Sequence, residues 1–249
     1  MSASLLLLFG LGSASLATSF VSGILGMAGG MLLMGILLAA LPVAAAMTLH
    51  GITQFTSNAG RAWMLRSQVN WPITLGYAGG AAVAWIAFAL VQVRLGKGAA
   101  LLVMGGMPFV GLALPKRLRL DVMRRGHAAA CGLACMGISL MAGVAGPILD
   151  LFFVRSAMGR REVVATKAFT QASTHLAKVA YFGMLVREEA DMPILLAAVM
   201  VVLAIAGTRL SKGVLERMSD ASFRQWTRGT LMVLGVAYVG AGLVLLRTS

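Results

Sequence analysis

Residues 20–30 read Phe20-Val21-Ser22-Gly23-Ile24-Leu25-Gly26-Met27-Ala28-Gly29-Gly30 and place four glycines inside an apolar stretch. No Asp, Glu, Lys or Arg precedes Arg61. This part of the chain is therefore long enough for two helical membrane crossings, at about 20 residues each. Glycine tolerates the backbone angles of a tight turn. We expect residues 2–41 to form a helical hairpin that turns at Gly26–Gly30.

A second glycine-rich break lies in the other half of the chain, at Leu140-Met141-Ala142-Gly143-Val144-Ala145-Gly146-Pro147. Both breaks contain Gly-x-x-Gly, with glycine pairs at 23/26 and 143/146. The stretch 127–155 is therefore expected to form a second hairpin that turns at Gly143–Pro147. It is shorter than the first hairpin and better suits a segment that re-enters the membrane.

A polar segment follows each break, and the two segments align. Residues His50–Arg61 match Lys167–Lys178, so that Thr53-Gln54 falls on Thr170-Gln171. The polar segments are offset by 117 residues (167 − 50) and the breaks by 120 (143 − 23). This alignment predicts an internal repeat, with a first transmembrane repeat at 1–115, a basic cytoplasmic loop at 116–126 and a second transmembrane repeat at 127–249.

The composition is that of a membrane protein. Hydrophobic residues make up 59% and charged residues 12% of the 249 residues, whereas soluble domains carry about 25% charged residues. The chain is also too apolar to be disordered, and its continuous apolar runs lack the alternation of β-barrel strands. Further uncharged runs that suit helical crossings lie at 67–93, 98–115, 126–149, 192–208 and 229–246.

The positive charges gather in short segments between the apolar runs. The net charge is +13, from 21 Lys and Arg and 8 Asp and Glu. Basic loops mark the cytoplasmic side of a membrane protein, so we interpret these residues as topology signals and expect no nucleic-acid partner. The acidic segment 187–191 is expected outside. The basic clusters are Lys116, Arg117, Arg119, Arg124 and Arg125; Arg155, Arg160 and Arg161; and Arg209, Lys212, Arg217, Arg224 and Arg228.

The number of crossings between these clusters gives the two halves opposite orientations. The fold class is therefore predicted to be an all-α polytopic membrane protein with two inverted repeats, each a glycine-broken helical hairpin plus about three transmembrane helices. Inverted repeats with broken elements are typical of secondary transporters. The transmembrane helices are predicted at 43–65, 71–93 and 98–115, and at 163–186, 192–210 and 229–247.

Polar side chains line one face of each polar segment when the residues are placed on a helix. Polar groups are costly in lipid, so both stripes should face the protein interior or a water-filled cavity. Two alternatives stay open: hydrogen bonding between neighbouring helices, and snorkelling of the basic side chains to the membrane interface. The stripes are His50, Thr53, Gln54, Ser57 and Arg61, and Lys167, Thr170, Gln171, Thr174 and Lys178.

The breaks and stripes together predict an anion site near the middle of the bilayer. An interrupted helix leaves free N–H groups that attract anions, although close helix packing would also explain the glycines. Asp150 either pairs with a nearby cation, which we favour, or carries a coupling proton. His50 and His175 fit a hydrogen-bonded core as well as a ligand contact. The predicted substrate-binding residues are Gly26, Gly29, Gly30, His50, Gln54, Ser57, Asn58, Arg61, Gly143, Gly146, Gln171, Thr174, His175 and Lys178.

The broken N-terminal stretch, its echo in the second half and the polar helix after each resemble the TauE/SafE sulfite-exporter family of membrane permeases. The run Arg161-Glu162-Val163-Val164-Ala165-Thr166-Lys167-Ala168, with Gln171, His175, Lys178 and Tyr181-Phe182-Gly183, is similar to one branch of that family. The resemblance implies transport of sulfite, sulfonates or related organosulfur and carboxylate anions. The family's usual Gly-Gly-Gly run and following proline is replaced here by Gly-Val-Ala-Gly-Pro, which leaves the substrate more open than the fold.

We therefore predict a multi-pass protein of the cell inner membrane, a secondary transporter that moves a small anion by alternating access. Since the sequence has no ATP-binding motif, an ion gradient or the gradient of the substrate would drive transport. A coupling proton or cation and a homodimer stay open. A passive anion channel and a non-transporting assembly protein are the alternatives, and an enzyme is not expected. No cofactor or metal is expected either, because Cys131 and Cys135 lie one helical turn apart and suit packing.

Overall fold

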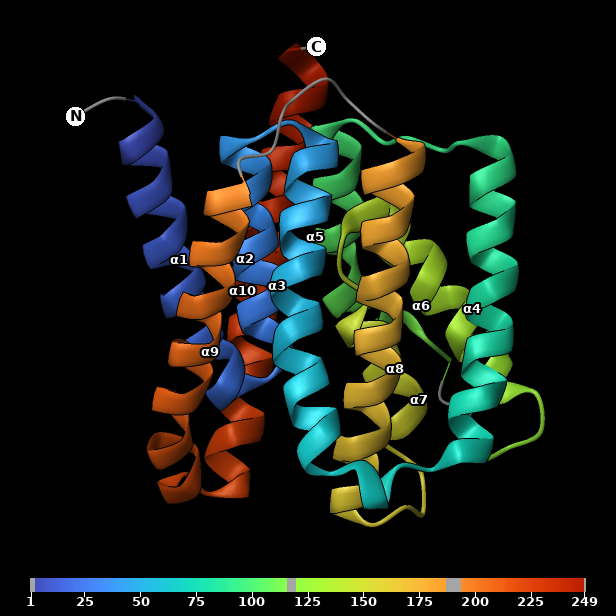
Figure 1. Ribbon diagram of the computed structural model, residues 1–249. Coiled ribbons are helices and arrows are strands. Elements are labelled where there is room, and N and C mark those ends of the chain that lie inside the picture. The colour runs from blue at the N-terminus through green and yellow to red at the C-terminus, as the bar shows by residue number, and fades with distance from the viewer. Residues whose placement is uncertain (1–2, 116–119, 187–193, 249) are drawn as a thin grey trace.

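The computed structural model describes residues 3–115, 120–186 and 194–248 (Figure 1), and every regular element in those ranges is helical. The basic residues Lys116, Arg117 and Arg119 and the acidic segment 187–191, on which the predicted topology partly depends, lie outside the described residues. The first half holds α1 (Ala3–Leu25), α2 (Met27–Ala40), α3 (Val43–Met64), the 3-10 helix η1 (Arg66–Gln68), α4 (Trp71–Val91) and α5 (Lys97–Ala113). The second half holds α6 (His127–Ala142), α7 (Gly146–Phe153), α8 (Arg160–Ala180), the π-helix η2 (Tyr181–Leu185), α9 (Ile194–Arg217) and α10 (Asp220–Thr248).

Both breaks lie where the sequence predicts them, and each contains a glycine with a positive φ. Gly26 separates α1 from α2 with φ 66° and ψ −115°. Gly143 ends α6 with φ 82° and ψ −21°, and α7 begins at Gly146. Residues with a Cβ rarely adopt a positive φ. The glycines therefore allow the chain to turn at these two points.

The two hairpins differ in helix length. Helices α1 and α2 contain 23 and 14 residues, and α6 and α7 contain 16 and 8. At 1.5 Å per residue, α1 is about 35 Å long and α7 about 12 Å. Helix α1 is thus long enough to cross a hydrocarbon core of about 30 Å, whereas α7 extends across less than half of that thickness.

The linker between α3 and α4 is fastened to α8 by Asn70. The Asn70 side chain accepts a hydrogen bond from the Ile73 N–H (3.1 Å) and so caps the start of α4. Its own amide donates to Glu162 (2.7 Å), and its backbone N–H donates to the Thr166 hydroxyl (2.9 Å). These contacts fix the beginning of α8 against the beginning of α4.

The helices pack in four main pairs: α1 with α9, α4 with α6, α5 with α10, and α3 with α8. Small residues allow close approach in these pairs. In the α4–α6 pair, a Cβ at Gly80 would meet the Ala129 carbonyl, and a Cβ at Gly132 would meet the Tyr77 carbonyl. In the α1–α9 pair, a Cβ at Gly207 would meet the Leu16 carbonyl. The glycines of α4, α6 and α9 therefore set the distances between these helices.

Four of the described helices contain segments long and apolar enough to cross a membrane, in α1, α4, α9 and α10 (Leu5–Leu25, Trp71–Val91, Ile194–Val214 and Gln225–Thr248). Figure 1 shows α1 and α9 at one side of the molecule, α4 at the other, and α3 beside α8 in between. Large apolar side chains are exposed on α4, α9 and α10, as lipid contact requires. The chain is therefore an all-helical membrane protein whose two polar helices lie inside a more apolar set.

Three of the connections that carry or adjoin basic residues lie at the same end of the helices. In Figure 1 the connections from α3 to α4, from α7 to α8 and from α9 to α10 are all at the lower end. These connections carry or adjoin Arg66, Arg155, Arg160 and Arg217. The connections from α2 to α3 and from α4 to α5 are at the opposite end, and Arg94 lies in the latter.

The substitution Gly80→Leu tests the α4–α6 packing. The added side chain would overlap the backbone of α6, and overpacking costs about 1–3 kcal/mol or more. We expect a lower melting temperature for the detergent-purified protein. Gly79→Leu is the matched control, since a Cβ at the exposed Gly79 meets nothing within 4 Å. Equal melting temperatures for the two variants would contradict the close approach of α4 and α6.

Candidate anion-binding site

A small cavity of about 40 Å³ lies where both breaks and both polar helices meet. Its wall comes from the start of α2, the middle of α3, the α6–α7 break and the middle of α8, with one residue from α4. A water molecule needs about 10–15 Å³ measured in this way, so the cavity can hold a group of only a few atoms. The lining residues are Met27, Gly30, Met31, His50, Gln54, Tyr77, Cys135, Ser139, Val144, Ala145, Gly146, Pro147, Leu149, Gln171, Thr174 and His175.

Lys178 and His50 form a buried hydrogen-bond network behind the cavity wall. The Lys178 amine donates to His50 Nδ1 (2.8 Å) and to the Gly143 carbonyl (2.7 Å). On the other side of the ring, His50 Nε2 lies 3.0 Å from the Gly30 carbonyl. Because a carbonyl only accepts, Nε2 carries the proton and Nδ1 is free to accept from Lys178. The network joins α8, α3, α2 and the α6–α7 break.

Lys178 therefore does not snorkel to the membrane interface, which was one alternative left open by the sequence. Its side chain is 0% exposed, and its contacts are with residues 128 and 35 positions away in the chain. Lys167 is also held inside, by Asp150. Arg61 is partly exposed and does not line the cavity.

Two of the residues that line the cavity each have a buried polar atom with no hydrogen-bond partner among the described residues. These atoms are the Ser139 hydroxyl and His175 Nδ1. The His175 ring lies edge-on to His50, with 5.5 Å between the ring centroids. Unsatisfied buried polar atoms are rare in folded proteins and require an explanation such as a ligand or a water molecule.

The hydroxyl of Thr174 forms hydrogen bonds with two partners in the protein. It donates to the Thr170 carbonyl of its own helix (2.9 Å), so the Tyr77 hydroxyl must be the donor in the 2.7 Å contact between the two side chains. Thr53 likewise donates to the Leu49 carbonyl (2.8 Å). The Tyr77–Thr174 contact joins α4 and α8, as the alternative of hydrogen bonding between neighbouring helices predicts. The other two bonds each lie within a single helix, and Thr174 also lines the cavity.

The predicted glycines divide into two groups. Gly30 and Gly146 line the cavity, whereas Gly26, Gly29 and Gly143 do not. A Cβ at Gly29 would meet the Thr18 carbonyl, so this glycine allows α1 and α2 to pack closely. Of the second break, Gly143–Pro147, Pro147 cannot donate to an anion, because proline has no N–H.

The other predicted residues are divided in the same way. Gln54, Gln171 and His175 line the cavity, as His50 does. Ser57 and Asn58 do not; Asn58 instead donates to the Gln54 carbonyl (2.9 Å), and the buried Ser57 hydroxyl has no partner among the described residues. The sequence analysis missed Ser139, Tyr77 and Cys135. Only Ser139 left a signal, as a polar residue in the apolar run just before the second break.

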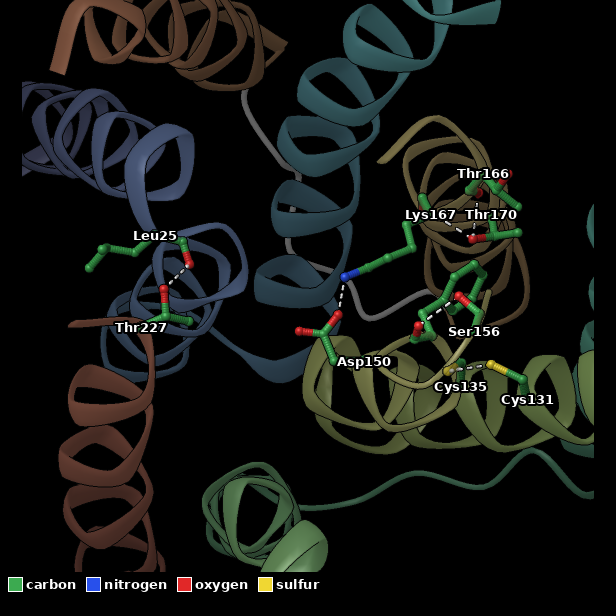
Figure 2. A network of polar contacts seen from close by, with 10 residues as sticks. Leu25, Cys131, Cys135, Asp150, Ser156, Thr166, Lys167, Thr170 and Thr227 are labelled. Atoms are coloured by element: carbon green, nitrogen blue, oxygen red, sulfur yellow. Dashed lines mark hydrogen bonds and ion pairs between the residues drawn. The ribbon is translucent and has the colours of Figure 1, made fainter. Parts of the chain in front are cut away.

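Asp150 forms an ion pair with Lys167, the pairing that the sequence analysis favours for it. Figure 2 shows the Lys167 side chain extending from α8 to the Asp150 carboxylate on α7. Both residues line a second cavity of about 470 Å³ between α5, α7, α8 and α10, hereafter the vestibule. The vestibule and the central cavity share Met27 and Pro147 as lining residues.

The two cysteines lie side by side on α6, with their Sγ atoms 3.9 Å apart, and both are free thiols (Figure 2). They are buried, as packing residues would be. Only Cys135 lines the central cavity.

The sequence was then compared with known proteins. The model of the family described as sulfite exporter TauE/SafE matches residues 11–238, nearly the whole chain. No curated protein and no solved structure matches the sequence at a significant level. The family is one of membrane transporters for sulfur anions and not of enzymes, in agreement with the polar cavity inside an apolar helical bundle. The chain belongs to the TauE/SafE sulfite exporter family.

Proposed function

We propose that the chain is a secondary transporter that carries a small sulfur oxyanion, such as sulfite or a short sulfonate, through the central cavity. The observation that carries the proposal is the meeting of both glycine breaks and both polar helices at one cavity inside the bundle. Sites at the interface of two broken elements are typical of secondary transporters. The basic connections at one end of the helices favour a multi-pass arrangement in the cell inner membrane with that end in the cytoplasm.

The chemistry of the wall suits an anion. Neutral donors are available from Ser139, the amides of Gln54 and Gln171, and the N–H of Gly146 at the start of α7. Behind the wall is the amine of Lys178, and no carboxylate contacts it in the part of the chain that the structure describes. A buried cation needs a counter-charge. An anion in the cavity would supply it.

The size of the cavity narrows the substrate class. A space of about 40 Å³ corresponds to about three water molecules. It suits an ion of four or five heavy atoms, such as sulfite or methanesulfonate. A larger aromatic sulfonate would have to displace Met27, Met31 or Leu149 from the wall.

The pairing of the helices supports the inverted repeat of residues 1–115 and 127–249 on either side of the basic loop 116–126. If α1 to α5 correspond to α6 to α10, the α1–α9 pair corresponds to the α6–α4 pair, and the α3–α8 and α5–α10 pairs each correspond to themselves. Two side-chain contacts also correspond between the two halves. The His50–Gly30 hydrogen bond and the Lys167–Asp150 ion pair join equivalent positions in the two halves.

The two cavities support alternating access in which this conformation faces inward. The vestibule lies beside the ends of α5 and α7 and the start of α10, near the basic connections. It adjoins the central cavity at Met27 and Pro147. On the other side of the central cavity, Lys178 ties His50 to the Gly143 carbonyl and closes the passage. In the outward-facing conformation, the side closed by Lys178 would open and the vestibule side would close.

A panel of anions tests the proposed function. An anion at a hundredfold its Kd adds about 2.7 kcal/mol to stability, so sulfite, sulfate and methanesulfonate should raise the melting temperature of the purified protein. Benzenesulfonate should not, because the cavity is too small for it. In proteoliposomes, accumulation of labelled sulfite against its gradient would separate a transporter from a passive channel. If no anion of the panel changes melting and none is transported, the anion site is wrong.

The substitution Ser139→Ala separates binding from folding. The Ser139 hydroxyl has no partner among the described residues, so its removal should leave the stability of the unliganded protein unchanged or slightly higher. Loss of one hydrogen bond to the anion, about 1 kcal/mol, should weaken binding about fivefold. Ser173→Ala, at an exposed position on α8, is the control and should alter neither the stability of the protein nor its affinity for the anion. Unchanged anion affinity in Ser139→Ala would remove this residue from the site.

Thiol labelling tests the orientation and the open side. The two native cysteines are buried, so a membrane-impermeant maleimide should not label the wild-type protein. Thr227→Cys, in the vestibule, should be labelled from the cytoplasmic side in inside-out vesicles. Arg94→Cys, in the connection at the opposite end, should be labelled only from the outside in intact cells. The reverse pattern would invert the proposed topology.

A further inference from the structure

We propose that Lys178 carries the coupling proton: its amine is uncharged while the central cavity is empty and becomes an ammonium when an anion enters. The inference rests on the proposed function, because it names the ion that moves with the anion. It assigns the coupling role, for which the sequence offered Asp150 as a candidate, to a lysine with no counter-charge among the described residues.

The two lysines of α8 differ in burial and in counter-charge: Lys167 is partly exposed, whereas Lys178 is not. Lys167 has a permanent counter-charge in Asp150. Lys178 is completely buried, and its described acceptors are both neutral, namely His50 Nδ1 and the Gly143 carbonyl. A charged ammonium in such a place carries the full cost of desolvation, whereas a neutral amine does not.

The number of hydrogen bonds agrees with a neutral amine. An uncharged amine has two N–H groups, and Lys178 has two described acceptors. The ammonium form would have a third N–H to satisfy. The titratable groups near Lys178 are His50 on α3 and His175 one turn earlier on α8, and neither can provide a negative charge. The α6–α7 break contributes only the carbonyl of Gly143.

The coupling step balances in atoms and charge. A proton from water that reaches the cavity adds to the lone pair of the Lys178 amine, and the anion occupies the cavity on the other side of His50. With a monoanion such as methanesulfonate, one positive and one negative charge enter together, so the loaded interior stays neutral. A dianion such as sulfate enters with a net charge of −1. Neither charge is then buried alone. The anion and the proton should leave together for the same reason.

Asp150 is less suited to this role. It lines the vestibule and not the central cavity, and Lys167 holds it as a carboxylate through the ion pair. A proton on Asp150 would leave Lys167 without a counter-charge, and it would not compensate an anion in the central cavity.

Linkage between the two binding events gives a measurable result. If each anion binds with one proton, anion affinity should fall about tenfold for each unit that the pH rises above neutrality. By linkage, the anion should raise proton affinity by the factor by which protonation raises anion affinity. The probes are methanesulfonate and sulfate, which do not titrate in this range. Adding either to the purified wild-type protein at pH 8, in a weakly buffered solution under a pH electrode, should remove about one proton from solution for each anion bound.

Variants assign the proton to a residue. Lys178→Arg keeps a permanent charge, so it should bind the anion with no proton uptake and with an affinity that does not change with pH. Lys178→Met has no charge, and it should lose anion binding while it keeps its fold, because an apolar chain replaces a neutral one. The matched control is Lys167→Arg, in which Asp150 still compensates the cation, and its proton uptake should equal that of the wild type.

The possible results of these experiments distinguish the coupling step, its assignment to Lys178 and the anion site itself. Anion binding without proton uptake in the wild type would overturn the coupling and leave the proposed anion site intact. Proton uptake that persists in Lys178→Met, or that disappears in Asp150→Asn alone, would place the proton elsewhere and overturn the assignment. Absence of binding by both anions would count against the central site itself and so against the proposed function as well as this inference.

Discussion

The Lys178 amine donates hydrogen bonds to His50 and to the Gly143 carbonyl. It thereby links polar groups for which lipid offers no hydrogen-bond partner. Hydrocarbon offers no partner for an amine, an imidazole or a free backbone carbonyl, so each must find one inside the protein. His50 extends the network to the Gly30 carbonyl at the start of α2. Both broken hairpins and both polar helices are thereby held in one arrangement, and the central cavity lies where they meet.

The rest of the bundle keeps this network away from lipid. The apolar helices α1, α4, α9 and α10 flank the polar pair α3 and α8, and glycines such as Gly80 and Gly132 let backbones approach until little space is left between helices. Hydrophobic attraction between helices is weak in a membrane, so close van der Waals packing has to provide the cohesion. Glycine therefore has two roles in this protein. It allows the chain to turn at Gly26 and Gly143, and within the helices it allows neighbouring backbones to come into contact.

Most of the fold could be predicted from local pattern, and much of the site could not. The breaks at Gly26 and Gly143 were predictable because glycines in an apolar run leave a local signal. The burial of Lys178 was not, because it depends on partners that are distant in the chain. Helical periodicity placed Ser57 and Gln54 on one stripe, yet only Gln54 lines the cavity, since the position of a residue along the helix axis matters as much as its face. Tyr77 and Cys135 come from helices α4 and α6, whose approach the sequence did not reveal.

The two halves are similar in pattern but differ in chemistry at the positions that matter most. Where the first half has His50 and Gly30, joined by a neutral hydrogen bond, the second has Lys167 and Asp150, joined by an ion pair. The first contact forms part of the cavity wall, whereas the second faces the vestibule. A symmetric pair of halves could exchange conformations at equal energy, but a neutral contact and an ion pair respond differently to water, salt and a passing anion. In the alternating-access cycle that we propose, the inward and outward conformations should therefore differ in stability, and these four residues should contribute to the difference.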